Sequence, residues 1–151
     1  MKLNSYLNFA GNAEDAFEFY RSVFGGEFAS LVRFRDLPIE GVTIPPEDQD
    51  KIMHIGLPIG EGELLMASDT LESLGQELVQ GNNLYISVHP PSREEADRIF
   101  GALSEGGEIE MPIADQVWGD YYGSLKDRFG VLWMVNYGVP REEQAPDQSR
   151  P

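Results

Sequence analysis

The stretch SYLNFAGNAEDAFEFYRSVFGGEF, residues 5–28, sets the architecture of this chain because a version of it returns as NLYISVHPPSREEADRIFGALSEGGEI, residues 83–109. Each copy begins with a short apolar segment typical of a strand, passes through a turn and continues with helical periodicity. Asn12 and Ser92 stand where N-caps are expected, and Gly-Gly-Glu follows each helical segment. The two stretches therefore predict the same strand–helix unit twice.

The two helical segments also agree in the residues that they are expected to bury. Equivalent places at the spacing of one buried stripe are occupied by Ala16, Phe19, Tyr20 and Val23 in the first segment and by Ala96, Ile99, Phe100 and Leu103 in the second. The glycine pairs at 25–26 and 106–107 are expected to supply left-handed caps at the helix ends.

Strand patterns follow each helical segment. They cover residues 28–34, 51–58 and 63–67 in the first half, and 109–113, 118–126 and 131–137 in the second. Two further turns, GEGE and DRFG, are expected to join neighbouring strands as hairpins. Each half is thus β-α-β-β-β, and the expected α+β organisation is a first module at 1–68, a connector at 69–82, a second module at 83–138 and a disordered tail at 139–151.

A four-stranded sheet with one helix leaves one sheet face uncovered. Two such modules in tandem can pair their uncovered faces into a concave cavity with the helices outside. The sequence therefore predicts a ligand cavity between the sheets. Two of the strands, GELLMASD (62–69) and GVLWMVNY (130–137), carry Met66 and Met134 at matching places, and side-chain alternation puts Met134 on one face with Leu132 and Asn136.

Composition excludes several classes of protein. The 151 residues include no cysteine, which excludes disulfides, thiolate metal sites and a cysteine nucleophile. The formal charge of −15, from 26 acidic and 11 basic residues, disfavours nucleic acid as a partner. No apolar run has the length of a membrane span and no leader-like segment begins the chain, so no membrane association and a cytoplasmic location are expected.

Several of these motifs resemble one known family. The duplicated βαβββ pattern, the AEDAFEFY helix with its FGGE ending, and the closing DRFGVLWMVN are similar to the vicinal oxygen chelate superfamily, which includes glyoxalase I, extradiol dioxygenases and bleomycin-resistance proteins. The segments HIGLPIGEGELLMASD and GEIEMPIADQVWGDYYGSLKDRFGVLWMVN resemble its PhnB-like branch, often labelled 3-demethylubiquinone 3-methyltransferase-like. The resemblance implies a glyoxalase/bleomycin-resistance/dioxygenase-like fold. The methyltransferase label has no support in the residues, because no glycine loop follows a first strand and leads into a helix.

The resemblance also implies where a metal ion is held in metal-dependent members. Matching their four ligand positions, which are usually His, Glu, His and Glu, to this chain gives Ser5, Met66, Asn83 and Met134. Hydroxyl, amide and thioether groups do not suit a hard divalent cation, and thioethers suit only soft ions such as Cu(I). Apolar packing by the two methionines is the favoured interpretation. We therefore expect no metal site and no cofactor.

His54 is the one histidine within a predicted strand, in KIMHIGLP. Alternation along this segment places His54 on one face with Ile52 and Gly56, and Met53 on the other with Ile55. Two interpretations stay open for His54: a catalytic or ligand-binding role through proton transfer or hydrogen bonding, and a structural hydrogen bond.

The segment QVWGDYYGSLKD contains an aromatic cluster of Trp118, Tyr121 and Tyr122. These residues are candidates for lining a pocket around a planar or apolar ligand, with core or dimer packing as the equal alternative. Polar candidates for ligand contacts are Ser5, Asn8, Asn83 and Tyr85.

The expected function is metal-independent binding of a small organic molecule, by a chain that the resemblance leads us to expect as a homodimer. Whether the protein is an enzyme stays open. One alternative is a lyase, isomerase or oxidoreductase of the glyoxalase or dioxygenase type, and another is a drug-sequestering resistance protein.

Overall fold

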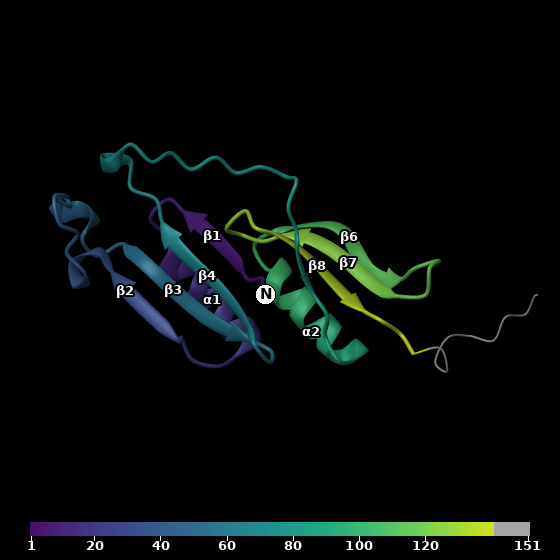
Figure 1. The fold of residues 1–151 in the computed structure, drawn as a ribbon. Helices are drawn as coiled ribbons and strands as arrows, with labels where there is room; N and C mark the ends of the chain where they lie inside the picture. The colour runs from purple at the N-terminus through teal and green to yellow at the C-terminus, as the bar shows by residue number, and fades with distance from the viewer. Residues whose placement is uncertain (141–151) are drawn as a thin grey trace, which may run out of the picture. The chain divides into compact units, whose positions relative to one another are not determined.

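A computed structural model describes residues 1–140 of the chain, which divide into two compact units (Figure 1). The first unit is Met1–Gln80 and the second begins at Gly81, so that the division falls inside the predicted connector. Residues 141–151, most of the segment expected to be a disordered tail, lie outside the described residues, whereas Val139 is buried.

The first unit is a four-stranded sheet with one long helix. Its strands lie in the order β1-β4-β3-β2, with β1 parallel to β4 and the other neighbours antiparallel. The elements in chain order are β1 (Ser5–Phe9), α1 (Ala13–Phe24), β2 (Ser30–Arg33), β3 (Ile52–Ile59) and β4 (Glu63–Asp69), with short 3-10 turns η1 (Phe34–Asp36), η2 (Pro46–Asp48) and η3 (Glu72–Leu74).

The second unit repeats this topology. Its sheet has the order β5-β8-β7-β6, with β5 parallel to β8. The elements are β5 (Ile86–Val88), α2 (Arg93–Ser104), β6 (Glu108–Asp115), β7 (Tyr121–Lys126) and β8 (Leu132–Tyr137). The prediction of an α+β protein built from two βαβββ modules is confirmed. The strand predicted over 118–126 was too long, because Trp118 and Gly119 belong to the turn between β6 and β7.

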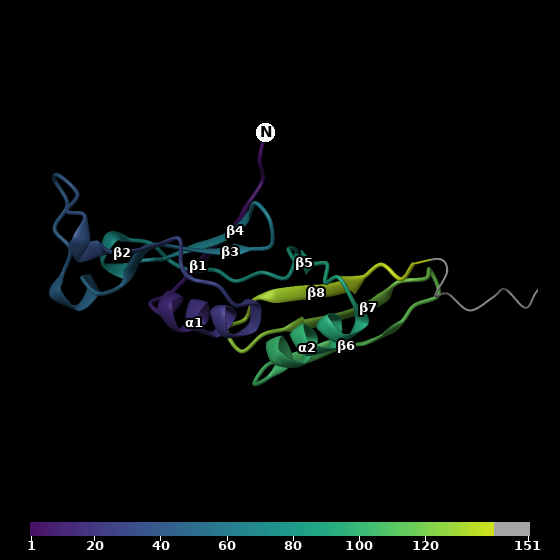
Figure 2. The same cartoon turned by 90° about the horizontal axis from the view of Figure 1, so that it is seen from below.

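One face of each sheet packs against the helix of its own unit, and we call the other the open face. Figure 2 shows α1 on one side of the first sheet. Strand register assigns the side chains: in β4, Leu65 and Ala67 are buried beneath the helix, whereas Met66 and Ser68 point the other way. In β8, Trp133 and Val135 are buried on the helix face and Met134 lies on the open face. The cavity between the two sheets stays a prediction.

The helices begin and end in different ways. Ser92 caps α2 as predicted, since its hydroxyl accepts a hydrogen bond from the Glu95 N–H at 3.2 Å. Asn12 makes no such side-chain bond. The start of α1 is held instead by Asp69, whose carboxylate accepts hydrogen bonds from the N–H groups of Gly11 and Ala13, each at 3.0 Å. A carboxylate distant in sequence thus replaces the predicted local cap.

The glycine pairs after the helices also differ. Gly25 and Gly26 both have positive φ, but Gly25 has a ψ of −170° and is therefore not in the predicted left-handed helical conformation. In the second pair only Gly106 has positive φ. Gly107 is needed for space, because a Cβ there would lie 2.2 Å from the carbonyl oxygen of Lys126.

Two predicted burial patterns need correction. In α1 the buried aromatic residues are Phe17 and Tyr20, and Phe19 is only half-buried. In β3 the predicted pairing of Ile52 with His54 on one face is wrong. Val32 is opposite His54 and Arg33 is opposite Ile52, so that Met53 is an extra, bulged residue. Because a bulge breaks the two-residue alternation, Ile52 turns to the buried helix face.

Candidate functional site

The open face of the first unit carries most of the candidate residues from that half. Tyr6 lies beside Met66 and Asn8 beside Ser68, since β1 and β4 are paired in parallel at these positions. His54 follows on β3, on the same face as Gly56, which is opposite Met66. Three strands thus bring a phenol, an imidazole, an amide and a thioether to one surface.

Tyr6 and His54 are in direct contact. The Tyr6 hydroxyl lies 3.2 Å from His54 Nδ1, and the two ring centroids are 5.7 Å apart. A partner at Nδ1 fixes the orientation of an imidazole ring and leaves Nε2 for another interaction. This contact was not predicted. Side-chain alternation along β1 could have indicated Tyr6, because it places residues 6 and 8 on the same face.

Ser5 does not share this surface. It is paired with the buried Leu65, so its side chain points to the helix face, whereas Tyr6 points to the same face as Met66. The sequence comparison matched Ser5 to a ligand position of metal-dependent relatives. The side chain that shares a face with Met66 is the next one, Tyr6.

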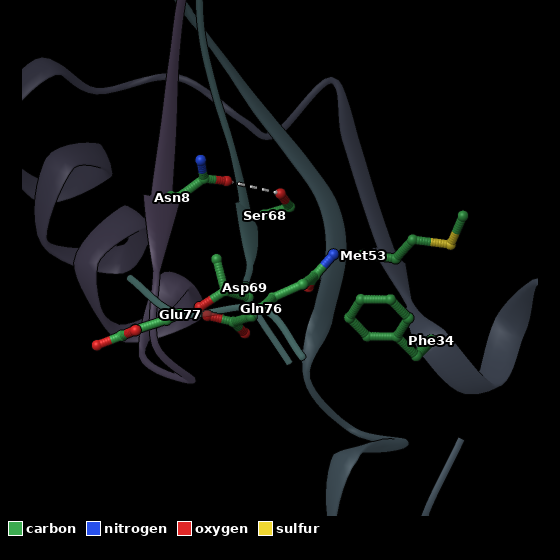
Figure 3. A pocket seen from close by; sticks show the side chains of 8 residues that line it. Asn8, Phe34, Met53, Ser68, Asp69, Gln76 and Glu77 are labelled. Atoms are coloured by element: carbon green, nitrogen blue, oxygen red, sulfur yellow. Dashed lines mark hydrogen bonds between the residues drawn. The ribbon is translucent and has the colours of Figure 1, made fainter. Parts of the chain in front are cut away.

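A pocket of about 490 Å³ lies at the end of this open face, where β1 and β4 finish (Figure 3). Its lining comes from three strands, η1 and the segment after β4, and consists of Asn8, Phe34, Met53, Ser68, Asp69, Thr70, Gln76 and Glu77. This volume is within the range of small-molecule sites in proteins.

The polar groups of the pocket are partly engaged already. The Ser68 hydroxyl donates to Asn8 Oδ1 at 3.3 Å, which leaves the Asn8 amide N–H₂ group to donate to a ligand (Figure 3). Gln76 Oε1 accepts from the Leu71 N–H at 2.8 Å, and its N–H₂ group likewise has donor capacity. The Asp69 carboxylate already accepts hydrogen bonds from three backbone N–H groups. Phe34 and Met53 supply apolar surface.

The buried carboxylate of Asp48 connects the loop before β3 with the segment after β4. Asp48 is buried, receives a hydrogen bond from the Ser73 hydroxyl at 2.6 Å and pairs with Lys51 Nζ at 2.7 Å. The hydrogen bond from Lys51 lowers the pKa of Asp48 and raises that of Lys51. The hydrogen bond from Ser73 to Asp48 connects the two chain segments that border the pocket.

The open face of the second unit brings together a second group of predicted residues. Met134 lies between Ser87 on β5 and Ser124 on β7, and Tyr122 lies beside Asn136. Trp118, in the turn before β7, contacts Tyr122 edge-on, with ring centroids 5.9 Å apart.

Tyr85 reaches across this face to Glu110, a residue that sequence reasoning missed. Its hydroxyl lies 2.9 and 3.1 Å from the two Glu110 carboxylate oxygens, although β5 and β6 are the opposite edges of the sheet. The hydrogen bond to the carboxylate raises the pKa of Tyr85, because the neutral phenol is the donor. Sequence spacing gave no signal for Glu110, which stands in an acidic edge strand that resembles solvated surface.

Tyr121 and Asn83 do not join this group. The Tyr121 hydroxyl donates to Asp97 on α2 at 2.5 Å, and the Arg93 guanidinium lies 4.8 Å from the Tyr121 ring centroid, so Tyr121 belongs to the helix face. The hydrogen bond to Asp97 raises the pKa of Tyr121. Asn83 is exposed and precedes β5, which begins only at Ile86.

The donor set at the implied metal positions does not fit a hard divalent cation. Met66 and Met134 lie on the open faces with thioether groups, Ser5 faces the helix side, and Asn83 lies outside the strands. Within residues 1–140, no three His, Asp or Glu side chains are grouped closely enough to hold a metal ion.

Two βαβββ units, each with a helix on one face of its sheet and candidate residues on the other, define a class of proteins that use this repeated module. A family model for the Glyoxalase/Bleomycin resistance protein/Dioxygenase superfamily matches residues 2–135, and the chain belongs to that superfamily. Neither helix in residues 1–140 has the length and apolar character needed to cross a membrane.

Individual relatives agree with this assignment. Protein YjdN of Escherichia coli is 31% identical over 146 residues, which cover 90% of this chain and 95% of YjdN. The crystal structure of protein PA1353 from Pseudomonas aeruginosa is similar with a TM-score of 0.77 and 39% identity, covering 91% of this chain and 97% of that one. The structure of the PhnB protein from Bacillus cereus is similar with a TM-score of 0.71 and 26% identity, covering 91% of this chain and 99% of that one. The expected likeness to the PhnB-like branch is confirmed.

Proposed function

We propose that the chain binds a small organic molecule, without a metal ion, in the pocket at the ends of β1 and β4. The observation that carries this proposal is the composition of the pocket: amide donors on Asn8 and Gln76 stand with the apolar surface of Phe34 and Met53. A few placed polar groups within apolar surroundings are typical of ligand sites.

The Tyr6–His54 contact supports a second candidate, a proton-transfer reaction on the bound molecule. His54 adjoins the pocket residue Met53 along β3, and Tyr6 orients its imidazole ring from β1. Among the alternatives given above, this contact favours an isomerase or lyase, because both require an oriented acid or base. The homodimer implied by the family resemblance is likewise a proposal.

The test is a thermal-shift screen of small organic compounds against the wild-type protein and Ser68→Leu. Leucine at position 68 would fill the pocket and remove the hydroxyl that holds Asn8. A compound at a hundredfold excess over its Kd stabilises the wild-type protein by about 2.7 kcal/mol, or roughly 5–10 °C in Tm. We expect Ser68→Leu to lose this stabilisation.

Ser22→Leu is the matched control, because it makes the same change on the exposed surface of α1. It should respond to each compound as the wild-type protein does. The proposal is wrong if no compound stabilises the wild-type protein, or if Ser68→Leu is stabilised to the same extent. His54→Ala in the same screen separates binding from proton transfer: it should retain compound binding and lose any turnover.

A further inference from the structure

The two amide side chains in the pocket at the ends of β1 and β4 present hydrogen-bond donors to a ligand, because their acceptors are engaged. We propose that this pocket takes an uncharged organic molecule with a flat ring, whose carbonyl oxygens accept hydrogen bonds from Gln76 and Asn8. This inference rests on the proposed function, since it names the class of ligand for the same pocket.

The Gln76 side chain is oriented by Leu71. Gly75 ends η3 in the left-handed conformation, with a φ of 77°, and the Gln76 N–H then donates to the Leu71 carbonyl oxygen at 3.1 Å. Gln76 Oε1 accepts from the Leu71 N–H at 2.8 Å. Leu71 itself is fully buried, which makes it a firm anchor. With its oxygen engaged in this way, the Gln76 side chain directs Nε2 toward Phe34 and Met53 (Figure 3).

Asn8 has the same division between acceptor and donor. Its Oδ1 accepts from the Ser68 hydroxyl at 3.3 Å, and its amide nitrogen has no hydrogen-bond partner within residues 1–140. Over the same residues, Gln76 Nε2 has none either. Each amide therefore has N–H donors open to the pocket, and the ligand that matches them carries acceptor oxygens.

The charge of the pocket disfavours an anionic ligand. In the described part of the chain, its lining includes two carboxylates, on Asp69 and Glu77, and no basic side chain. Arg33 and Arg35, on either side of Phe34 in the sequence, are each paired with a carboxylate of the same unit. An anionic group would thus enter the pocket without a cationic partner. The acceptor that suits neutral amide donors here is an uncharged carbonyl.

A cationic ligand is disfavoured for a different reason. The Asp69 carboxylate accepts three backbone N–H bonds, and Glu77 is exposed, so that water and salt screen its charge. A cation would also bring N–H donors to a pocket whose amides already offer donors.

The apolar side of the pocket suits a flat ring. Phe34 and Met53 are both half-buried, and they lie on the side toward which Gln76 Nε2 points (Figure 3). An aromatic ring and a polarisable thioether pack favourably against a planar group. A ring with a carbonyl substituent can therefore contact this surface and reach the Gln76 donor together.

The experiment is an NMR titration of the full chain with three probes of the same shape: benzamide, benzoate and benzamidinium. They are neutral, negative and positive, and benzamidinium has donors but no acceptor oxygen. Backbone amide signals and the side-chain N–H₂ signals of Asn8 and Gln76 are followed. Benzamide should shift the Gln76 N–H₂ signal in a saturable way, and the two charged probes should bind at least about fivefold more weakly.

Gln76→Glu is the variant that tests the donor. Glutamate keeps an oxygen to accept from the Leu71 N–H and replaces the N–H₂ donor by a second acceptor. Benzamide binding should weaken about tenfold, whereas benzamidinium binding should strengthen, because its donors then meet a carboxylate. Gln80→Glu is the matched control: it adds the same charge to the segment after β4, outside the pocket lining, and should change each affinity less than about twofold.

Binding of benzoate or benzamidinium as tight as that of benzamide would overturn the inference, and so would equal weakening of benzamide by the two variants. The absence of a saturable shift with benzamide would overturn it as well. The Ser68→Leu screen tests the proposed function separately. If that screen finds only charged compounds that need the open pocket, the proposed function stands and the class of ligand named here is wrong.

Discussion

Asp69→Ala is expected to lower the free energy of unfolding by about 3–5 kcal/mol. Asp69 is 3% exposed and its two oxygens accept three backbone hydrogen bonds: from Gly11 and Ala13 at 3.0 Å and from Ile52 at 2.8 Å. This one side chain connects the end of β4 with the start of α1 and the start of β3. Its removal leaves the N–H groups of Ala13 and Ile52 without an acceptor in buried surroundings, and each such group costs roughly 1–3 kcal/mol.

Urea denaturation followed by circular dichroism measures this effect. Asp69→Asn is the matched variant, because it keeps the volume and one carbonyl oxygen, and should lose about half as much stability. A loss below about 1 kcal/mol for Asp69→Ala would contradict the role given to this carboxylate.

Asp127→Ala is expected to cost about 2–4 kcal/mol in the second unit. One carboxylate oxygen accepts from the N–H groups of Phe129 and Val131, at 2.8 and 3.0 Å, and closes the turn before β8. The other oxygen accepts from Trp133 Nε1 at 2.9 Å. Trp133 is fully buried, so the substitution removes a hydrogen bond from an indole N–H that lies in the core.

The matched control for this prediction is Asp115→Ala in the same unit. Asp115 pairs with Arg93 at 2.7 Å, but its side chain is 66% exposed, and surface ion pairs contribute less than about 1 kcal/mol. Urea denaturation should therefore separate the two variants clearly. Similar losses for both would mean that the buried hydrogen bonds of Asp127 are not the main contribution.

The fold was largely predictable because the same pattern is present twice. A strand, a capped amphipathic helix and three further strands occur in each half, and the stripes of α2 and the cap at Ser92 follow local rules. The start of α1 was not predictable in this way, because Asp69 is far from Asn12 in sequence. The bulge at Met53 escaped prediction for a similar reason, since it depends on pairing with β2.

The positions of candidate site residues were predictable only where side-chain alternation along a regular strand decides which face a residue occupies. Met66, Met134 and Asn8 lie on the open faces, as expected for residues on regular strands. Tyr121 and Tyr122 are adjacent, and only the pairing with β8 and the contact with Asp97 decide which of them faces the helix. Glu110 and Tyr6 acquire their importance from partners on other strands, which sequence spacing does not reveal.

The central claim is that this member of the superfamily binds its ligand with side chains alone, because its implied metal positions hold Ser5, Met66, Asn83 and Met134. Elemental analysis by mass spectrometry tests this most directly, on protein purified without chelator and then dialysed against Mn²⁺, Ni²⁺ and Zn²⁺ in turn. We predict less than about 0.1 equivalent of any of these metals per chain after removal of the free ion. Close to one equivalent of a divalent metal, retained through gel filtration, would contradict the account.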